Sequence, residues 1–260
     1  MTSVLITGAA GRIGGYLRSG LPPLGWHLRC LDLAGPAEHD GLPWSIGDVA
    51  DAEVLSKAMV DVEAVVHLAG IPTEAPFADL RQANIEGTYQ VFEAARQAGV
   101  HRVVYASSNH AVGFHESGAQ LTTAVRPRPD SLYGVTKVFG EALGSFYADR
   151  YAMDVAAVRI GSCFDRPPGE RSLATWLSPN DSVRLIDALL RAPSFGFQVL
   201  YGISANTRAW WDLAPAIALG YRPEDDAEDF AKEVLSDRAP LSEDDPDRRY
   251  VGGRAALGSW

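Results

Sequence analysis

VLITGAAGRIG, residues 4–14, joins a short apolar run to the start of a helical pattern through three glycines. The run from Val4 to Thr7 has the apolar, β-branched character of a buried strand. Glycines at positions 8, 11 and 14 permit a tight turn and let the backbone approach a bound group closely. A pyrophosphate there would be stabilised by the N-terminus of the following helix. The spacing departs from the commonest dinucleotide pattern, Gly-x-Gly-x-x-Gly, so a plain glycine turn is the alternative interpretation.

Short apolar runs alternate with helix-length segments along the rest of the first 160 residues. Further strands are predicted at residues 28–33, 64–68, 102–107 and 155–160. Helices are predicted at residues 13–21, 51–59, 79–98 and 133–151. Continuous apolar runs are typical of parallel strands that are covered on both faces, and the intervening helices supply the crossovers. The sequence therefore predicts an α/β fold with a Rossmann-type, doubly wound parallel sheet.

The rhythm of the chain changes after Ile160, where Pro167-Pro168-Gly169 marks a loop. A helix at 182–191 and a strand at 197–201 are predicted beyond it. We expect residues 1–160 to form the dinucleotide-binding core, and residues 161–260 to form a small C-terminal substrate-binding lobe and tail. The charge-rich stretch 243–249 is interpreted as a solvated helix and tail rather than a site.

Composition excludes several classes of function. Among 260 residues, 23 are Lys or Arg and 33 are Asp or Glu, a formal charge of −10 without a basic run. Nucleic acid is therefore not an expected partner. The absence of a long apolar stretch and of a secretory signal predicts no membrane insertion and a cytoplasmic location. Two cysteines and six scattered histidines without ligand spacing predict neither a disulfide framework nor a metal site.

An aspartate closes the second predicted strand. Asp32 follows Gly8 by 24 residues, where a carboxylate can accept hydrogen bonds from a ribose diol and would repel a 2′-phosphate. Neither Leu33 nor Ala34 supplies a cation for such a phosphate, so NAD is favoured over NADP. Asp48, which precedes Val49 and the next helix, would either bond the adenine amino group or cap that helix.

The pentapeptide Tyr133-Gly-Val-Thr-Lys137 places a phenol and an ammonium on one helical face. We expect Lys137 to lower the pKa of Tyr133 and also to reach the ribose, which makes Tyr133 a candidate acid–base group. Ser108 follows the strand at 102–107, whose carboxyl end would lie over the nicotinamide, so its hydroxyl can hold a substrate oxygen. If the pentapeptide is considered alone, the simpler interpretation is that this tyrosine and lysine lie on the surface of a helix without a catalytic role.

Together these motifs resemble the extended short-chain dehydrogenase/reductase superfamily over about the first 160 residues. The resemblance rests on Gly8, Gly11, Gly14, Asp32, Asp48, the run His67-Leu68-Ala69-Gly70, Asn84, Ser108, Tyr133 and Lys137. Over nearly the whole chain, a second set is similar to uronate dehydrogenases. This set comprises the run 107–110, the run 159–163, Arg171 with Thr175-Trp176, the run 204–206 and Trp210-Trp211. Sugar-nucleotide epimerases carry Val-Tyr-Gly after the serine strand, whereas Ala111-Val112-Gly113 follows here.

The resemblance implies oxidation of D-glucuronate or D-galacturonate at C1 to an aldarolactone, with NAD reduced to NADH. It implies Ser108, Tyr133 and Lys137 as the catalytic group. It implies substrate contacts from Ser108, Asn109, His110, Tyr133, Ser162 and Arg171, in which the arginine fork would match the carboxylate. It implies cofactor contacts from Gly8, Gly11, Arg12, Ile13, Gly14, Asp32, Leu33, Asp48, Val49, Leu68, Ala69, Gly70, Tyr133, Lys137 and Cys163.

Some features stay open at this point. The family is expected to place a serine after the run 68–71, but this chain has Pro72 followed by Thr73. His67 and the tryptophans at 176, 210 and 211 are interpreted as packing residues. A nucleotide-sugar epimerase or dehydratase would need a larger second lobe, and a non-catalytic NAD-sensing protein would not need Tyr133. The helices flanking such a sheet favour a homo-oligomer.

Overall fold

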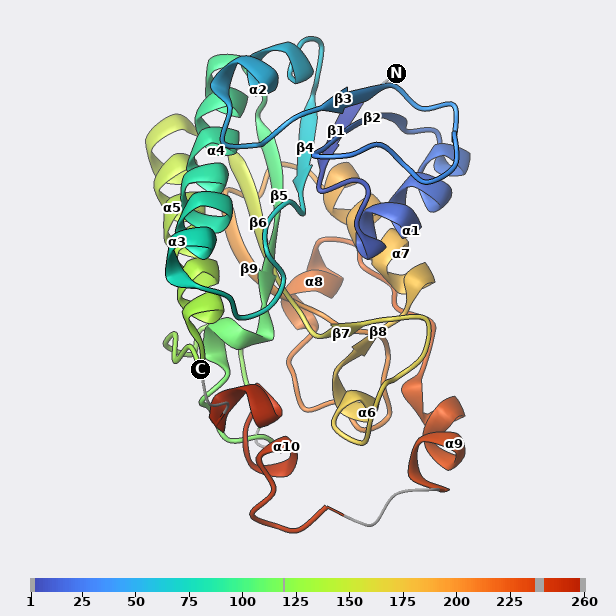
Figure 1. Ribbon diagram of the computed structural model, residues 1–260. Helices are drawn as coiled ribbons and strands as arrows, with labels where there is room; N and C mark the ends of the chain where they lie inside the picture. The colour runs from blue at the N-terminus through green and yellow to red at the C-terminus, as the bar shows by residue number, and fades with distance from the viewer. Residues whose placement is uncertain (1–2, 119, 237–240, 258–260) are drawn as a thin grey trace.

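Seven parallel strands form the central sheet of the computed structural model, which describes residues 3–118, 120–236 and 241–257 (Figure 1). The strands are β1 (Ser3–Thr7), β2 (His27–Asp32), β3 (Trp44–Ile46), β4 (Ala64–His67), β5 (Arg102–Ser108), β6 (Asp154–Ile160) and β9 (Phe197–Gly202). Their order across the sheet is β3-β2-β1-β4-β5-β6-β9, and every neighbouring pair is parallel. The predicted Rossmann-type sheet is therefore confirmed, with β3 as a strand that the apolar runs did not reveal.

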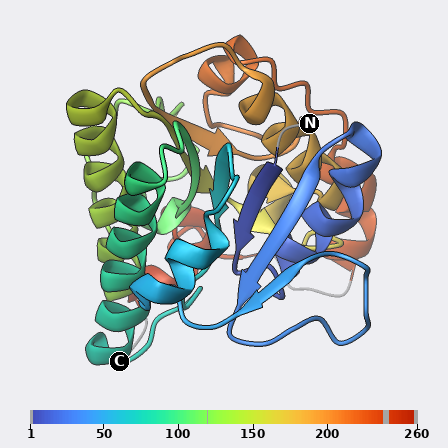
Figure 2. The ribbon, with the colours of Figure 1, turned by 90° about the horizontal axis from the view of Figure 1, so that it is seen from above.

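Helices bury both faces of the sheet because successive strand residues point to opposite sides. Ile6 and Val66 belong to one apolar cluster, whereas Leu5 and Val65 belong to the other. The first cluster is covered by α1 (Arg12–Gly20), α7 (Pro179–Arg191) and α8 (Ala214–Ala218). The second is covered by α2 (Ala52–Ala58), α4 (Gly87–Gln97) and α5 (Leu132–Tyr151), on the opposite side of the sheet in Figure 2. Burial on both faces explains why the strands read as continuous apolar runs.

Two helices differ from their predicted extents. The helix expected at 79–98 is instead α3 (Phe77–Leu80), a π-helical segment η2 (Arg81–Glu86) and α4. The wide turn of η2 carries the buried Asn84, and such turns are frequent at functional sites. Helix α7 begins at Pro179, three residues before the predicted start at 182, because the Ser178 hydroxyl caps it by accepting from the Asp181 N–H.

Smaller elements lie beyond the carboxyl ends of the strands, below the sheet in Figure 1. They include β7 (Ser162–Cys163), β8 (Trp176–Leu177), α6 (Ser172–Thr175), α9 (Ala231–Ser236) and α10 (Pro246–Arg249). Short helical turns complete the chain at η1 (Pro22–Leu24), η3 (Asn109–Val112), η4 (Ala227–Phe230) and η5 (Gly253–Leu257). The division at residue 160 stays a prediction; α7 and β9, which follow it in sequence, join the main sheet and its cover. No helix in the described ranges is both long and apolar enough to cross a bilayer.

A buried ion pair ties α5 to the sheet. Nε and Nη2 of Arg159 each donate to the Glu141 carboxylate at 2.8 Å, and the Ser107 hydroxyl donates to the same carboxylate at 2.6 Å. The side chains of Arg159 and Glu141 are only 2% and 7% exposed. Because a buried charge is costly without its partner, this pair holds α5, β5 and β6 in a single arrangement.

Glu141→Ala is expected to lower the free energy of unfolding by about 3–5 kcal/mol, because it leaves the Arg159 charge buried and unpaired. Urea unfolding at neutral pH would measure the loss. The matched control is Glu53→Ala, which removes one partner of the exposed pair with Lys57 and is expected to cost less than about 1 kcal/mol. Similar losses of unfolding free energy in the two variants would show that the buried pair stabilises the fold no more than the exposed pair does.

Candidate functional site

A cavity of about 1040 Å³ opens at the carboxyl edge of the sheet, where ligands bind in open α/β folds. It lies among residues that end or follow β1, β2, β4, β5 and β6. Every site residue predicted from the sequence lines it, from Gly8 in the first loop to Arg171 before α6. It is also lined by residues that sequence reasoning did not assign to the site, including Asp79, Gln82, Ala83 and Phe164.

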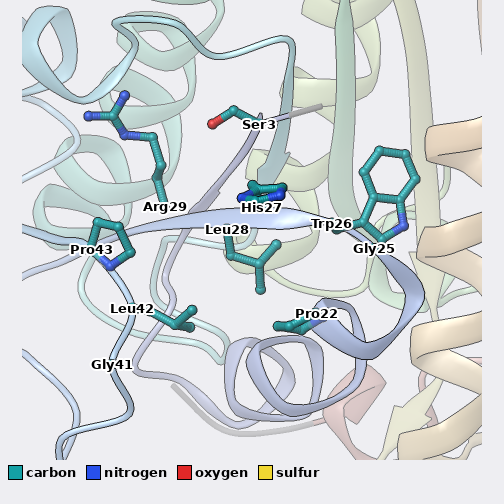
Figure 3. Close-up of a pocket in the computed structure, with 10 residues that line it drawn as sticks. All are labelled: Ser3, Pro22, Gly25, Trp26, His27, Leu28, Arg29, Gly41, Leu42 and Pro43. Carbon is teal, nitrogen blue, oxygen red and sulfur yellow. The ribbon is translucent and has the colours of Figure 1, made fainter. Parts of the chain in front are cut away.

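A second hollow, of about 670 Å³, lies at the opposite end of the sheet near the starts of β1 and β2 (Figure 3). Its lining is mainly apolar and includes Pro22, Trp26, Leu28, Leu42 and Pro43. None of the candidate catalytic or cofactor residues borders it. The chemistry of the molecule is therefore concentrated at the carboxyl edge.

The glycine loop leaves a bare backbone cradle at the start of α1. Gly8 has a φ of +70°, and a side chain there would come within 2.5 Å of the Ala69 nitrogen. A Cβ on Gly14 would lie 2.5 Å from the Ala9 carbonyl oxygen. In this described part of the chain, α1 has no side-chain cap and no acidic residue in its first turn. Its N–H groups thus suit a bound anion, and Arg12, which lies 4.2 Å over the Phe164 ring, adds a positive charge at the cavity.

Asp32 connects the second strand to this loop. One carboxylate oxygen accepts from the Ala10 N–H at 2.9 Å and the other from the Leu33 N–H at 2.7 Å. A carboxylate has further lone pairs, so Asp32 can still accept from a ribose diol. Asp48 lines the cavity and accepts from the Ala50 N–H in the loop before α2. The capping interpretation of Asp48 is wrong, because Asp51 caps α2 by accepting from the Glu53 and Val54 N–H groups, and the binding interpretation stays a prediction. The cradle and the carboxylate together fit a dinucleotide such as NAD.

The phenol of Tyr133 and the ammonium of Lys137 lie together on α5, as the four-residue step predicts. Lys137 Nζ donates to the Ala106 carbonyl at 2.9 Å and lies 5.4 Å from the centroid of the Tyr133 ring. Ser108 lines the same cavity and lies close enough to Tyr133 to lower its pKa, and its hydroxyl accepts from the His110 N–H at 3.2 Å. The three candidate catalytic residues therefore form one cluster, although they come from a strand end and a helix face.

Burial governs the ionisation of this pair. It raises the pKa of Tyr133 to about 12, partly offset by the hydrogen bond from Ser108, while the negative Asp130 raises it further. Burial also lowers the pKa of Lys137 to about 8. The Tyr133 pKa therefore lies above its ordinary value in the protein alone, where the sequence predicted a value lowered by Lys137, because desolvation of the phenolate is the largest effect.

Two polar side chains that sequence reasoning left without a role brace this region. Glu74 accepts from the Tyr133 N–H at 2.8 Å and thereby joins the loop after β4 to the start of α5. Asn84 accepts from the Ile71 N–H and donates to the Thr136 hydroxyl. Neither link could be read from local pattern, because the partners lie 13 to 59 residues apart.

The other end of the cavity carries the residues expected to contact a sugar. His110 Nδ1 lies 2.9 Å from the buried Asp130 carboxylate, and the His110 ring meets the Tyr133 ring edge-on at 5.7 Å. Asn109 and Arg171 both donate to a single backbone carbonyl, that of Val251, at 3.3 and 3.0 Å. The segment after 243–249 is thus not simply a solvated tail, because Val251 is fully buried beside the cavity residues.

Ser162 and Cys163 lie on β7 and both line the cavity. The Ser162 hydroxyl lies within 3.3 Å of the hydroxyls of Thr175 and Ser172. Burial raises the pKa of the Cys163 thiol to about 12, so that side chain is a thiol rather than a nucleophilic thiolate.

His67 lies outside this chemistry. It is fully buried, with its ring nitrogens 2.7 Å from the Thr7 hydroxyl and 3.1 Å from the Thr88 hydroxyl. Burial lowers its pKa to about 3, so the ring is neutral. Trp176 and Trp211 are also buried, in two separate apolar clusters. These contacts agree with the packing interpretation of His67 and of the two tryptophans.

Comparison with known proteins places this geometry in a family. Residues 4–196 match the NAD dependent epimerase/dehydratase family. A uronate dehydrogenase of Agrobacterium fabrum is 42% identical over 97% of this chain and 96% of its own. An NAD-dependent glucose-6-phosphate dehydrogenase of Haloferax volcanii is 37% identical over 88% of this chain and 96% of its own. A crystal structure of a mutant uronate dehydrogenase from Agrobacterium tumefaciens, complexed with NAD, has a TM-score of 0.94 at 40% identity, covering 100% of this chain and 98% of that one.

The lowered pKa of Lys137 predicts a specific dependence of stability on pH. Between about pH 8 and 10.5 the unfolded chain binds more protons at this lysine than the folded one, so the free energy of unfolding gains a contribution that rises with pH. Lys137→Met removes that contribution, so its stability relative to the native protein is expected to fall by about 3 kcal/mol across this window. Urea unfolding at pH 7.5 and pH 10 would measure it. Lys57→Met, at an exposed lysine of α2, should keep the native pH dependence, and an identical profile in both variants would contradict the prediction.

Proposed function

The chain belongs to the NAD dependent epimerase/dehydratase family and, within it, to the uronate dehydrogenases, and on that premise we propose that it oxidises a hexuronate at C1. The substrate would be D-glucuronate or D-galacturonate and the product the aldarolactone, with NAD reduced to NADH. The observation that carries the proposal is that Tyr133, Lys137, Ser108 and Arg171 all line one cavity. A proton acceptor and a carboxylate-binding group thus face the same space.

The chain's own residues divide the chemistry between them. Tyr133, as phenolate, takes the proton of the C1 hydroxyl, and Ser108 holds the oxygen that becomes the carbonyl. Lys137 holds a positive charge beside the phenol, from its position between the Tyr133 ring and the Ala106 carbonyl. When bound, NAD supplies the acceptor for the hydride that leaves C1. Because burial raises the pKa of Tyr133 to about 12 in the protein without ligands, its form there at neutral pH is the phenol, and the proposal requires the bound ligands to favour the phenolate.

Arg171 would select for the carboxylate of the sugar. Its guanidinium lines the cavity and uses one nitrogen, Nη1, for the Val251 carbonyl, which leaves further N–H donors for a ligand. Burial lowers the pKa of Arg171 from its ordinary value, but an arginine remains charged at working pH. A guanidinium also binds phosphate, which is relevant because one relative is a glucose-6-phosphate dehydrogenase.

The alternatives are less well supported. A nucleotide-sugar enzyme would have to hold a second nucleotide, and this chain has Ala111-Val112-Gly113 where sugar-nucleotide epimerases carry Val-Tyr-Gly. A non-catalytic NAD sensor has no use for the cluster of Ser108, Tyr133 and Lys137. Hexuronate oxidation uses every one of these residues.

The proposal is tested by NADH absorbance at mildly alkaline pH with NAD and, in parallel, glucuronate, galacturonate, glucose or glucose 6-phosphate. We expect reduction with a uronate and much slower turnover with glucose. Tyr133→Phe should lower kcat by at least about 10²-fold while NAD binding, followed by fluorescence quenching, stays nearly unchanged. Tyr89→Phe, at an exposed tyrosine of α4, is the matched control. Preference for glucose 6-phosphate, or full activity in Tyr133→Phe, would overturn the assignment.

We also propose that the protein is a homo-oligomer. Val135 and Phe146 of α5 and Tyr89 of α4 are large apolar or aromatic side chains that are exposed on one layer of helices. Exposed apolar surface of this kind marks contact sites. Phe146→Glu is expected to shift sedimentation velocity profiles toward the monomer, whereas Ile217→Glu on α8 should not. A native protein that sediments as a monomer would remove this part of the proposal.

A further inference from the structure

One backbone carbonyl accepts hydrogen bonds from two of the residues expected to contact the sugar. The Val251 oxygen accepts from Asn109 Nδ2 at 3.3 Å and from Arg171 Nη1 at 3.0 Å. These donors lie 142 and 80 residues away in the sequence. Since Val251 is fully buried, its carbonyl provides a fixed acceptor at the sugar end of the cavity.

The chain around Val251 pairs with another segment through its backbone. Residues 247–253 are here named the C-terminal clasp, and within it residues 249–252, between α10 and η5, run antiparallel to residues 113–117. The Val251 N–H donates to the His115 carbonyl at 2.9 Å, and the Gly252 N–H donates to the Gly113 carbonyl at 3.0 Å. The segment 113–117 directly follows η3, which carries Asn109, so the clasp and the site share one support.

Two glycines let the clasp come this close. A side chain on Gly252 would overlap the carboxylate of Asp130, the buried partner of His110. Gly253 has a φ of +64°, and a Cβ there would overlap Asp247 and lie 2.8 Å from Arg171 Nε. Only bare backbone fits between the acidic residues and the guanidinium.

The turn of the clasp is closed by Asp247. Its carboxylate accepts from the Arg254 N–H at 2.9 Å and from Arg254 Nε at 3.0 Å, and lies 3.9 Å from Arg171 Nε. Asp247 therefore both fixes the return of the chain at residues 253–254 and adds a negative charge beside Arg171. The guanidinium is thus restrained from two sides by one segment.

We propose that the C-terminal clasp is a positioning element for substrate recognition: through the Val251 carbonyl it orients Arg171 and Asn109 toward the carboxylate end of a hexuronate. The inference rests on the proposed function. Beyond the proposed function, the inference states that selectivity for the acidic sugar depends on clasp residues that touch no reacting atom. Arg171 has many rotamers, so an orientation set in advance saves the entropy of ordering it when the sugar binds.

Gly253→Ala tests the clasp, with Gly196→Ala as its matched control. Gly196 has a φ of +65°, so both substitutions impose the same backbone strain, but nothing lies within 4 Å of a Cβ at Gly196. We expect Gly253→Ala to raise KM for the uronate about tenfold with kcat changed less than about threefold, because uniform binding is lost. Gly196→Ala should leave both constants near the native values. Equal KM values in the two variants would overturn the proposal.

A second measurement does not depend on activity. Site-resolved phenylglyoxal labelling, read by mass spectrometry, reports how freely Arg171 reacts. Labelling of Arg171 should be slow in the native protein and in Gly196→Ala, and at least about threefold faster in Gly253→Ala, once its anchor is displaced. Unchanged labelling would overturn the clasp even if KM had risen.

The two proposals fail in different ways. If none of the sugars tested supports NAD reduction by the native protein, the proposed function is wrong. The labelling of Arg171 then decides by itself whether the clasp restrains this side chain. If Gly253→Ala does not fold, Asp247→Ala takes its place, since it removes the bonds to Arg254 without a clash or backbone strain. Faster labelling and a raised KM in that variant support the clasp, and native values overturn it.

Discussion

The close approach of helix α5 to strand β5 is the constraint on which the rest of the site depends. A Cβ on Gly140 would overlap the Tyr105 ring, and one on Gly134 would overlap the His110 carbonyl. The helix backbone therefore packs directly on the strand and on the turn that follows it. Tyr133 and Lys137 are carried on this helix, so their height above the sheet is set by that contact. Lys137 can reach the Ala106 carbonyl only because the helix lies so near.

The same burial that positions the pair sets its electrostatics. Desolvation favours the neutral form of each group, which raises the pKa of Tyr133 to about 12 and lowers that of Lys137 to about 8. Slightly deeper, the Glu141 carboxylate and the Arg159 fork neutralise each other and hold Ser107. Without ligands, Tyr133 is therefore a neutral phenol at neutral pH.

The two ends of the cavity are built in different ways. At the dinucleotide end, consecutive residues of one loop and the last residue of a neighbouring strand provide the cradle and the Asp32 carboxylate. At the sugar end, the polar groups come from distant segments and brace one another, as Asp130 does for His110 and the Val251 carbonyl does for Arg171.

Patterns of neighbouring residues were sufficient for six of the seven strands of the main sheet, the glycine cradle, Asp32 and the Tyr133–Lys137 pair. Each of these depends on short-range geometry: a continuous apolar run, a tight turn, or one turn of helix. The patterns were not sufficient for the π-helical segment at Asn84, the capping of α5 by Glu74, or the pKa of Tyr133. They also placed the acidic stretch before Val251 in solvent, although the next residues are buried against Asp130 and Arg171. These features arise from contacts across 13 to 142 residues. Burial and hydrogen bonding between such distant segments exist only after the chain has folded, because folding is what brings their partners together and removes the water.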